Sequence, residues 1–211
     1  MASSAHQAGA ANPGLVLRRP HRYDFTVWLF TRGGERGFRE KILDLAKLKP
    51  GERVLDVGCG TGTLAIAASK RVGAEVHGLD ASVEMLARAE SKARRDRAKV
   101  AFTEGAAQTL PYADGQFDVV LATLMLHHLP RKDRELCARE MRRVLAPGGR
   151  LLVVDFAIAA QGQKGVLAHF HRHGHVKPEA LTELLSNAGF SIAESGPVGV
   201  SDLHFVLATP S

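Results

Sequence analysis

The sequence predicts an α/β protein: a three-layer α/β/α domain around a seven-stranded, mostly parallel sheet. Short apolar blocks alternate with stretches of helical periodicity, which is the pattern of consecutive βα units. The 211 residues are enough for one such domain with its own hydrophobic core. With 45% hydrophobic and 24% charged residues, the composition is that of an ordinary globular protein.

The individual elements follow from local patterns. Strands are expected at the short apolar blocks, residues 53–57, 75–80, 100–103, 117–123, 150–156, 190–195 and 203–208. Helices are expected at residues 63–71, 82–95, 133–145 and 178–188. Ser82 is expected to cap the second helix, and the Pro-Gly-Gly run at 147–149 is a stop signal for the third.

The first part of the chain has a different composition. Residues 1–20 are small and polar and are expected to form a disordered tail, with a single domain over residues 21–211. Residues 21–48 are expected to supply N-terminal cap helices. The start of the chain lacks the apolar core of a signal peptide, and no apolar run approaches the roughly 18 residues of a membrane-spanning helix. The expected location is therefore cytoplasmic.

Charge and cysteine content narrow the possible partners. The net charge of +6 and the pI near 9.6 come from dispersed basic residues, which we interpret as solvated helix faces. Peripheral contact with an anionic membrane or an acidic substrate is the alternative, and no sequence-specific nucleic-acid binding is expected. Cys59 and Cys137 are far apart and form no CxxC pair, so neither a disulfide framework nor a zinc site is predicted.

The strongest local motif is a glycine loop after the first strand. Gly58, Gly60 and Gly62 join that strand to a helix, so the backbone can approach a ligand and helix N–H groups face it. A P-loop lysine is absent, and Thr63 stands where a nicotinamide-binding fingerprint needs Gly or Ala. The remaining alternative is a glycine-rich turn that binds nothing.

Two acidic residues indicate the ligand. Asp56 precedes the first glycine, where a carboxylate would repel a pyrophosphate but suit a cationic amino group. Asp80 ends the second strand and is placed to accept both hydroxyls of a ribose. The pair therefore favours a ligand with a ribose and an amino group.

Five ordered sequence blocks resemble the motifs of the class I methyltransferases that depend on S-adenosylmethionine (SAM). They are residues 54–62, 78–82, 104–112, 117–129 and 142–155. The resemblance implies a Rossmann-like fold whose last strand inserts antiparallel into the sheet. It also implies that SAM donates a methyl group to N, O or C of a small-molecule acceptor, leaving S-adenosylhomocysteine (SAH).

The resemblance also implies cofactor-binding residues. The methionine end of SAM would contact the loop residues Asp56, Gly58, Cys59, Gly60 and Gly62, and Asp80 would bind the ribose. The adenine would be bordered by Ala81, Met85, Gly105, Ala106 and Ala107, and the sulfonium by Thr123 and Leu124. Many relatives have Asp where this chain has Ala106, so Gln108 or a backbone carbonyl is expected to replace that acid.

A shorter resemblance lies upstream. Tyr23-Asp24 and the later Gly34-Glu-Arg36 are similar to the UbiE-like branch of quinone and phospholipid methyltransferases. By this likeness Tyr23 would close over the methionine part of SAM, and we count it among the candidate catalytic residues. The alternative is that Tyr23 belongs to a set of apolar anchors on a lid helix.

Two histidines follow the fourth strand, where such sheets open toward the ligand. Methyl transfer from a sulfonium needs a base only if the acceptor must lose a proton. We predict His128, and with less weight His127, as that base or as a substrate contact. The alternative is that one of the pair only packs near the cleft.

A second histidine group lies in residues 157–176, which are expected to form a substrate cap. Alternate positions share one face of a strand, which would suit metal binding by His169, His171, His173 and His175. Arg172 lies within the run and no carboxylate or cysteine is near, so we predict no metal site.

Two other functions remain as alternatives: a non-catalytic SAM-binding partner subunit and, disfavoured by Thr63 and Asp56, a nicotinamide-dependent oxidoreductase.

Overall fold

The computed structural model describes residues 35–73, 76–156, 178–200 and 202–211. The helices are α2 (Glu35–Leu45), α3 (Thr63–Val72), α4 (Val83–Asp96), the 3₁₀ turn η1 (Leu126–His128), α5 (Arg131–Val144) and α6 (Pro178–Asn187). The strands are β1 (Val54–Val57), β2 (Val76–Asp80), β3 (Val100–Glu104), β4 (Phe117–Thr123), β5 (Leu145–Phe156), β6 (Phe190–Pro197) and β7 (Leu203–Pro210).

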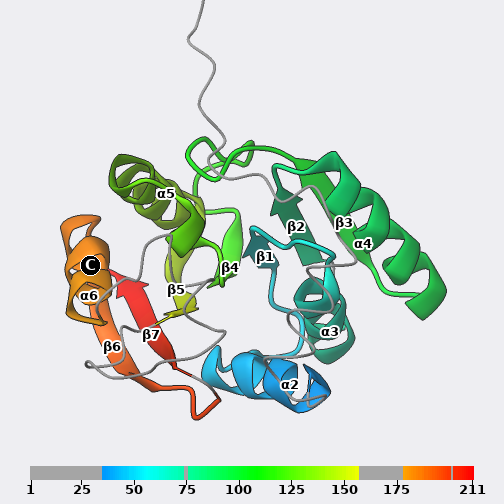
Figure 1. The fold of residues 1–211 in the computed structure, drawn as a ribbon, viewed down its shortest axis with the longest axis horizontal. Helices are drawn as coiled ribbons and strands as arrows, with labels where there is room; N and C mark the ends of the chain where they lie inside the picture. Colours follow the sequence, from blue (N-terminus) through cyan, green and yellow to red (C-terminus); the bar gives the residue numbers. More distant parts are fainter. Residues whose placement is uncertain (1–34, 74–75, 157–177, 201) are drawn as a thin grey trace, which may run out of the picture.

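The seven strands form one sheet in the order β3-β2-β1-β4-β5-β7-β6. Strands β1 to β5 pair in parallel, whereas β7 inserts antiparallel between β5 and β6. Helices α5 and α6 cover one face of the sheet, and α2 and α3 cover the other (Figure 1). The predicted fold class, including the antiparallel last strand, is therefore confirmed.

The hydrophobic core is divided by the sheet. All four residues of β1 are buried, as expected for a parallel strand covered on both faces. Leu55 and Val57 pack in the core under α5 and α6, whereas Val54 packs in the core under α2 and α3. Because β1 is central, the glycine loop that follows it starts from a rigid base.

Several boundaries differ from the sequence prediction by one or two residues, and the start of β5 differs by five. Helix α5 begins at Arg131, two residues before the expected start, immediately after Pro130. Strand β5 begins at Leu145, which pairs with Phe117 of β4. The Pro-Gly-Gly run lies inside this strand, and the pairing of β4 with β5 shifts register there. The glycines ended the helix as expected, but the chain returned directly to the sheet instead of forming a loop.

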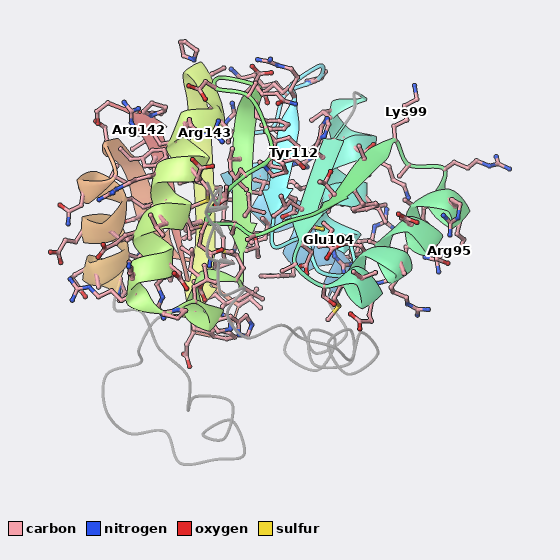
Figure 2. The ribbon with its side chains drawn as sticks, turned by 90° about the horizontal axis from the view of Figure 1, so that it is seen from above. Arg95, Lys99, Glu104, Tyr112, Arg142 and Arg143 are labelled. Carbon is pink, nitrogen blue, oxygen red and sulfur yellow. The ribbon has the colours of Figure 1, made fainter. Side chains whose placement is uncertain are left out.

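Ion pairs tie helices and loops to the amino ends of the strands. Arg150 donates to the carbonyl oxygens of Ala46 (2.6 Å) and Lys47 (2.6 Å) beyond α2 and forms two bonds to Glu52. On α5, Arg143 donates to the Tyr112 carbonyl oxygen at 2.8 Å (Figure 2). These arginines fix α2 and the segment before β4 against the sheet.

Basic residues are spread over the surface. Figure 2 shows Arg95 and Lys99 beside α4 and β3, and Arg142 and Arg143 on α5 at the other side of the sheet. Within the described ranges, no helix is long and apolar enough to cross a membrane. Tyr23 and the histidine group of residues 157–176 lie outside the described residues, and the expected domain limits remain predictions.

Candidate active site

The glycine loop between β1 and α3 has the backbone that its sequence predicts. Gly58, Gly60 and Gly62 have φ angles of 70°, 53° and 73°, in the left-handed region that favours glycine. A Cβ atom on Gly58 would lie 2.8 Å from the Met125 Cβ, and one on Gly62 would lie 2.7 Å from the Ala89 Cβ. Larger residues are therefore excluded from the loop by conformation and by space.

Asp80 links the glycine loop to the end of β2. Its carboxylate accepts hydrogen bonds from the Gly60 N–H at 2.8 Å and the Ser82 N–H at 2.9 Å. Burial raises the pKa of Asp80, although these backbone hydrogen bonds act to lower it. The side chain is only partly buried, so the carboxylate oxygens can also accept from ligand hydroxyls.

Asp56 lies deeper, below the glycine loop. It is buried, and its Oδ2 atom has no hydrogen-bond partner among the described residues. Burial, and then the charge of Asp80, raises the pKa of Asp56 to about 7. A buried carboxylate oxygen without a donor is costly, and a cationic amino group would relieve that cost. Asp56 therefore fits the amino end of SAM.

The residues expected around the adenine meet at the end of β2. Met85 is buried in the first turn of α4, and its N–H donates to the Ser82 hydroxyl, which confirms the predicted cap. The Gly105 N–H donates to the Asp80 carbonyl oxygen at 3.1 Å, which brings the segment after β3 beside β2. Ala107 and Gln108 in that segment are buried, and Ala81 and Ala106 are partly buried.

The end of β4 makes an unusual turn. Leu124 has a φ angle of 55°, a conformation that residues other than glycine rarely adopt, and its N–H donates to the Val154 carbonyl oxygen. This turn brings Met125 against Gly58. The Thr123 hydroxyl is buried without a hydrogen-bond partner among the described residues. The two residues predicted near the sulfonium therefore lie at a strained junction that contacts the glycine loop.

A histidine–aspartate pair lies directly beyond this junction. His127 Nδ1 is 2.6 Å from Asp155 Oδ1, and the His127 N–H donates to Asp155 Oδ2 at 3.0 Å. Asp155 is 1% exposed, and its Oδ1 also accepts from the Phe156 N–H. A carboxylate can only accept a hydrogen bond, so Nδ1 is the donor, and in the neutral imidazole Nε2 is then the nitrogen that can accept a proton. This is the arrangement of an oriented general base.

The contact with Asp155 makes His127 a better candidate for the base than His128, which the sequence favoured. His127 contacts the carboxylate, whereas His128 stacks beside it, with ring centroids 3.9 Å apart. Sequence reasoning missed Asp155, although it lies at the end of a predicted strand. Thr123, the last residue of β4, pairs with Val154 of β5 in the sheet. Asp155 therefore lies one residue beyond the end of β4, on the side where the chain continues to the two histidines. That parallel pairing was the signal that could have identified it.

Comparison with known proteins identifies the family. Residues 54–149 match the family described as methyltransferase domain. The demethylmenaquinone methyltransferase of Thermus thermophilus is 34% identical over 87% of this chain and 94% of its own length. The methyltransferase GfsG of Streptomyces halstedii is 39% identical over 59% of this chain, which spans 45% of that longer protein.

A solved structure shares the fold. A SAM-dependent methyltransferase from Aquifex aeolicus superimposes with a TM-score of 0.73 at 22% identity, over 90% of this chain and 97% of the other. The chain belongs to the class I SAM-dependent methyltransferases. It uses SAM to methylate a small-molecule acceptor, and the nicotinamide-dependent alternative has no support.

Proposed function

We propose that the protein methylates an oxygen or an acidic carbon of a small aromatic acceptor and that His127 removes the acceptor's proton. The observation that carries this proposal is the hydrogen bond between His127 Nδ1 and Asp155 Oδ1 at 2.6 Å. An amine acceptor in its free-base form needs no base, whereas a phenol, a quinol or a carbon acid does. The relative from Thermus thermophilus is named for demethylmenaquinone, which supports a quinone-type ring as the acceptor.

The cofactor would be held by the first two strands. In this proposal Asp56 accepts from the amino group and Asp80 accepts from the ribose hydroxyls. The buried, unpartnered Oδ2 of Asp56 and the partly exposed carboxylate of Asp80 support these roles. The remaining loop residues, Gly58, Cys59, Gly60 and Gly62, would place the backbone close to the methionine end. SAM supplies a methyl group on a positively charged sulfur, which makes displacement easy once the acceptor is aligned.

The acceptor would approach from the side of η1. Nε2 of His127 would take the proton from the acceptor atom that receives the methyl group. The buried carboxylate of Asp155 holds the imidazole in the required tautomer and stabilises the imidazolium that forms. Thr123 and Leu124 would border the transferred methyl group, and Tyr23 would close over the methionine part.

Replacement of His127 tests the proposed base. Loss of a general base costs on the order of 10²–10⁴ in rate. We expect His127→Ala to lower kcat at least about a hundredfold with quinol and phenol acceptors, whereas the control His128→Ala loses less than about tenfold. Both variants should bind SAH as the parent protein does. An active His127→Ala variant would remove the proposed base, and no turnover with any acceptor would favour the non-catalytic alternative.

We also propose that the protein makes peripheral contact with an anionic membrane. Helix α5 begins with Arg131, whose side chain is 91% exposed, and carries the exposed Lys132 and Leu136. Basic and apolar side chains together suit an anionic lipid surface. Co-sedimentation with phosphatidylglycerol vesicles, but not with phosphatidylcholine vesicles, is the expected result, and it should be lost in 0.5 M salt.

A further inference from the structure

Arg134 is held against the turn that carries His127. Its Nε–H donates to the Leu129 carbonyl oxygen at 2.8 Å, and the Leu129 N–H donates to the Leu126 carbonyl oxygen at 3.0 Å. The guanidinium is therefore fixed at the end of η1, on the first turn of α5. In the proposed function the acceptor approaches from the side of η1, which is the side where Arg134 lies.

This arginine differs from three other partly buried arginines near the sheet, each of which forms an ion pair with a carboxylate: Arg71 with Asp44, Arg143 with Glu140 and Arg150 with Glu52. Arg142 is also partly buried and has no carboxylate partner among the described residues, but its guanidinium donates to two carbonyl oxygens, those of Gly189 and Ser211. Among the described residues, Arg134 forms one hydrogen bond, made by Nε, and no carboxylate of theirs lies within ion-pairing distance. A guanidinium has five N–H donors, so four donors on its two terminal nitrogens remain for another group.

The surroundings of Arg134 give no structural reason for a positive charge at this position. The positive end of the α5 dipole disfavours a cation in the first turn. Burial lowers the pKa of Arg134, and the charge of Asp155 acts in the opposite direction. Holding the Leu129 carbonyl needs a donor but not a cation, and a neutral glutamine could do the same.

We propose that Arg134 binds a carboxylate or similar anionic oxygen of the methyl acceptor, next to the atom that His127 deprotonates. The planar guanidinium presents paired N–H groups that match a carboxylate. The Asp155 carboxylate would repel an anion placed beside it, and Arg134 supplies the opposing charge. The acceptor class is thus an aromatic hydroxy acid or an acid with equivalent geometry. This inference rests on the proposed function, since it places the acceptor beside η1.

A binding experiment tests the inference without requiring catalysis. Protein saturated with SAH is titrated with 1-hydroxy-2-naphthoate and with 1-naphthol, which share a ring and a hydroxyl but differ in the carboxylate. The variants are Arg134→Gln, which keeps a donor for the Leu129 carbonyl, and the control Arg139→Gln, which removes an exposed arginine from the same helix. The SAH Kd of each variant serves as the check on folding.

We expect the parent protein and Arg139→Gln to bind the naphthoate at least about tenfold more tightly than the naphthol, and Arg134→Gln to bind the two within about twofold. A parent protein that shows no preference, including one that binds neither compound, overturns the inference. So does an Arg134→Gln variant that keeps the preference. The variant His127→Ala should keep it, because binding involves no proton transfer. A preserved preference with unimpaired turnover in that variant would reject only the proposed base.

Discussion

At the amino ends of the strands carboxylates pair with arginines, whereas at the carboxyl ends they meet backbone N–H groups, a histidine or no donor. Hydrogen bonds from Arg53 lower the pKa of Asp118, and those from Arg143 lower the pKa of Glu140. At the other end, burial raises the pKa of both Asp56 and Asp80. A lowered pKa thus marks these acids paired with arginines, and a raised pKa marks the two acids that we propose to bind the cofactor.

Within the described residues, the carboxyl ends of the strands carry unpaired buried polar atoms together with backbone strain. Asp56 Oδ2 and the Thr123 hydroxyl are buried without hydrogen-bond partners among the described residues, and Leu124 has a strained backbone. All three lie where the proposed site is. The paired arginines at the opposite end offset this cost, so a substitution at one end should affect binding and one at the other should affect stability.

The largest effect is expected for Asp80→Ala. It removes the acceptor of the Gly60 and Ser82 N–H groups and the proposed ribose partner, so we expect the SAH Kd to rise more than about a hundredfold, roughly 2.7 kcal/mol. Asp118→Ala, at the other end of the sheet, is the matched control. It should lower the melting temperature but change the SAH Kd less than about threefold, as measured by calorimetry.

Arg150→Gln should show the reverse behaviour. It breaks the pair with Glu52 and the bonds to the carbonyl oxygens beyond α2. Removing one partner of a fully buried pair costs about 3–5 kcal/mol, and since these side chains are 14% and 15% exposed we expect about 2 kcal/mol. Urea unfolding measures this loss. An SAH Kd that changed in parallel would contradict the division between the two ends.

Gly58→Ala tests the contact between the glycine loop and Met125. The added methyl group would meet the Met125 Cβ at 2.8 Å and force the η1 turn away, so we expect at least about a tenfold loss of methyl transfer. Gly73→Ala has nearly the same φ angle, 66°, but no atom within 4 Å of the added carbon. It should lose about 1 kcal/mol of stability and little activity. Equal activity losses would show that backbone strain, not the contact, matters.

The smallest effect concerns pH. Because the pKa of Asp56 is raised to about 7 in the fold, the native state binds an extra proton between about pH 4 and 7. This group's contribution to stability therefore falls as pH rises through that range. Ionised Asp56 attracts the amino group of SAH, so affinity should rise severalfold between pH 6 and 7.5. Calorimetry on Asp56→Asn should give a flat profile, and a flat profile in the parent protein would contradict the assignment.

Much of the site could be predicted because its parts are local in sequence. The glycine loop, Asp56 and Asp80 each follow directly from a strand and the residues at its end. The Asp155 partner of His127 was missed because it depends on the pairing of β4 with β5, residues separated by 28 positions. The left-handed backbone of Leu124 could not be predicted, because residues other than glycine rarely adopt this conformation and nothing in the local sequence signals it.

The most direct test of the site is calorimetric titration of the purified protein with SAH, with NADH as the control ligand. One-to-one, micromolar binding of SAH and no binding of NADH is the predicted result. Absence of SAH binding by folded protein that carries no co-purified ligand, or binding of NADH instead, would contradict the assignment of the carboxyl ends of β1 and β2 as a SAM site.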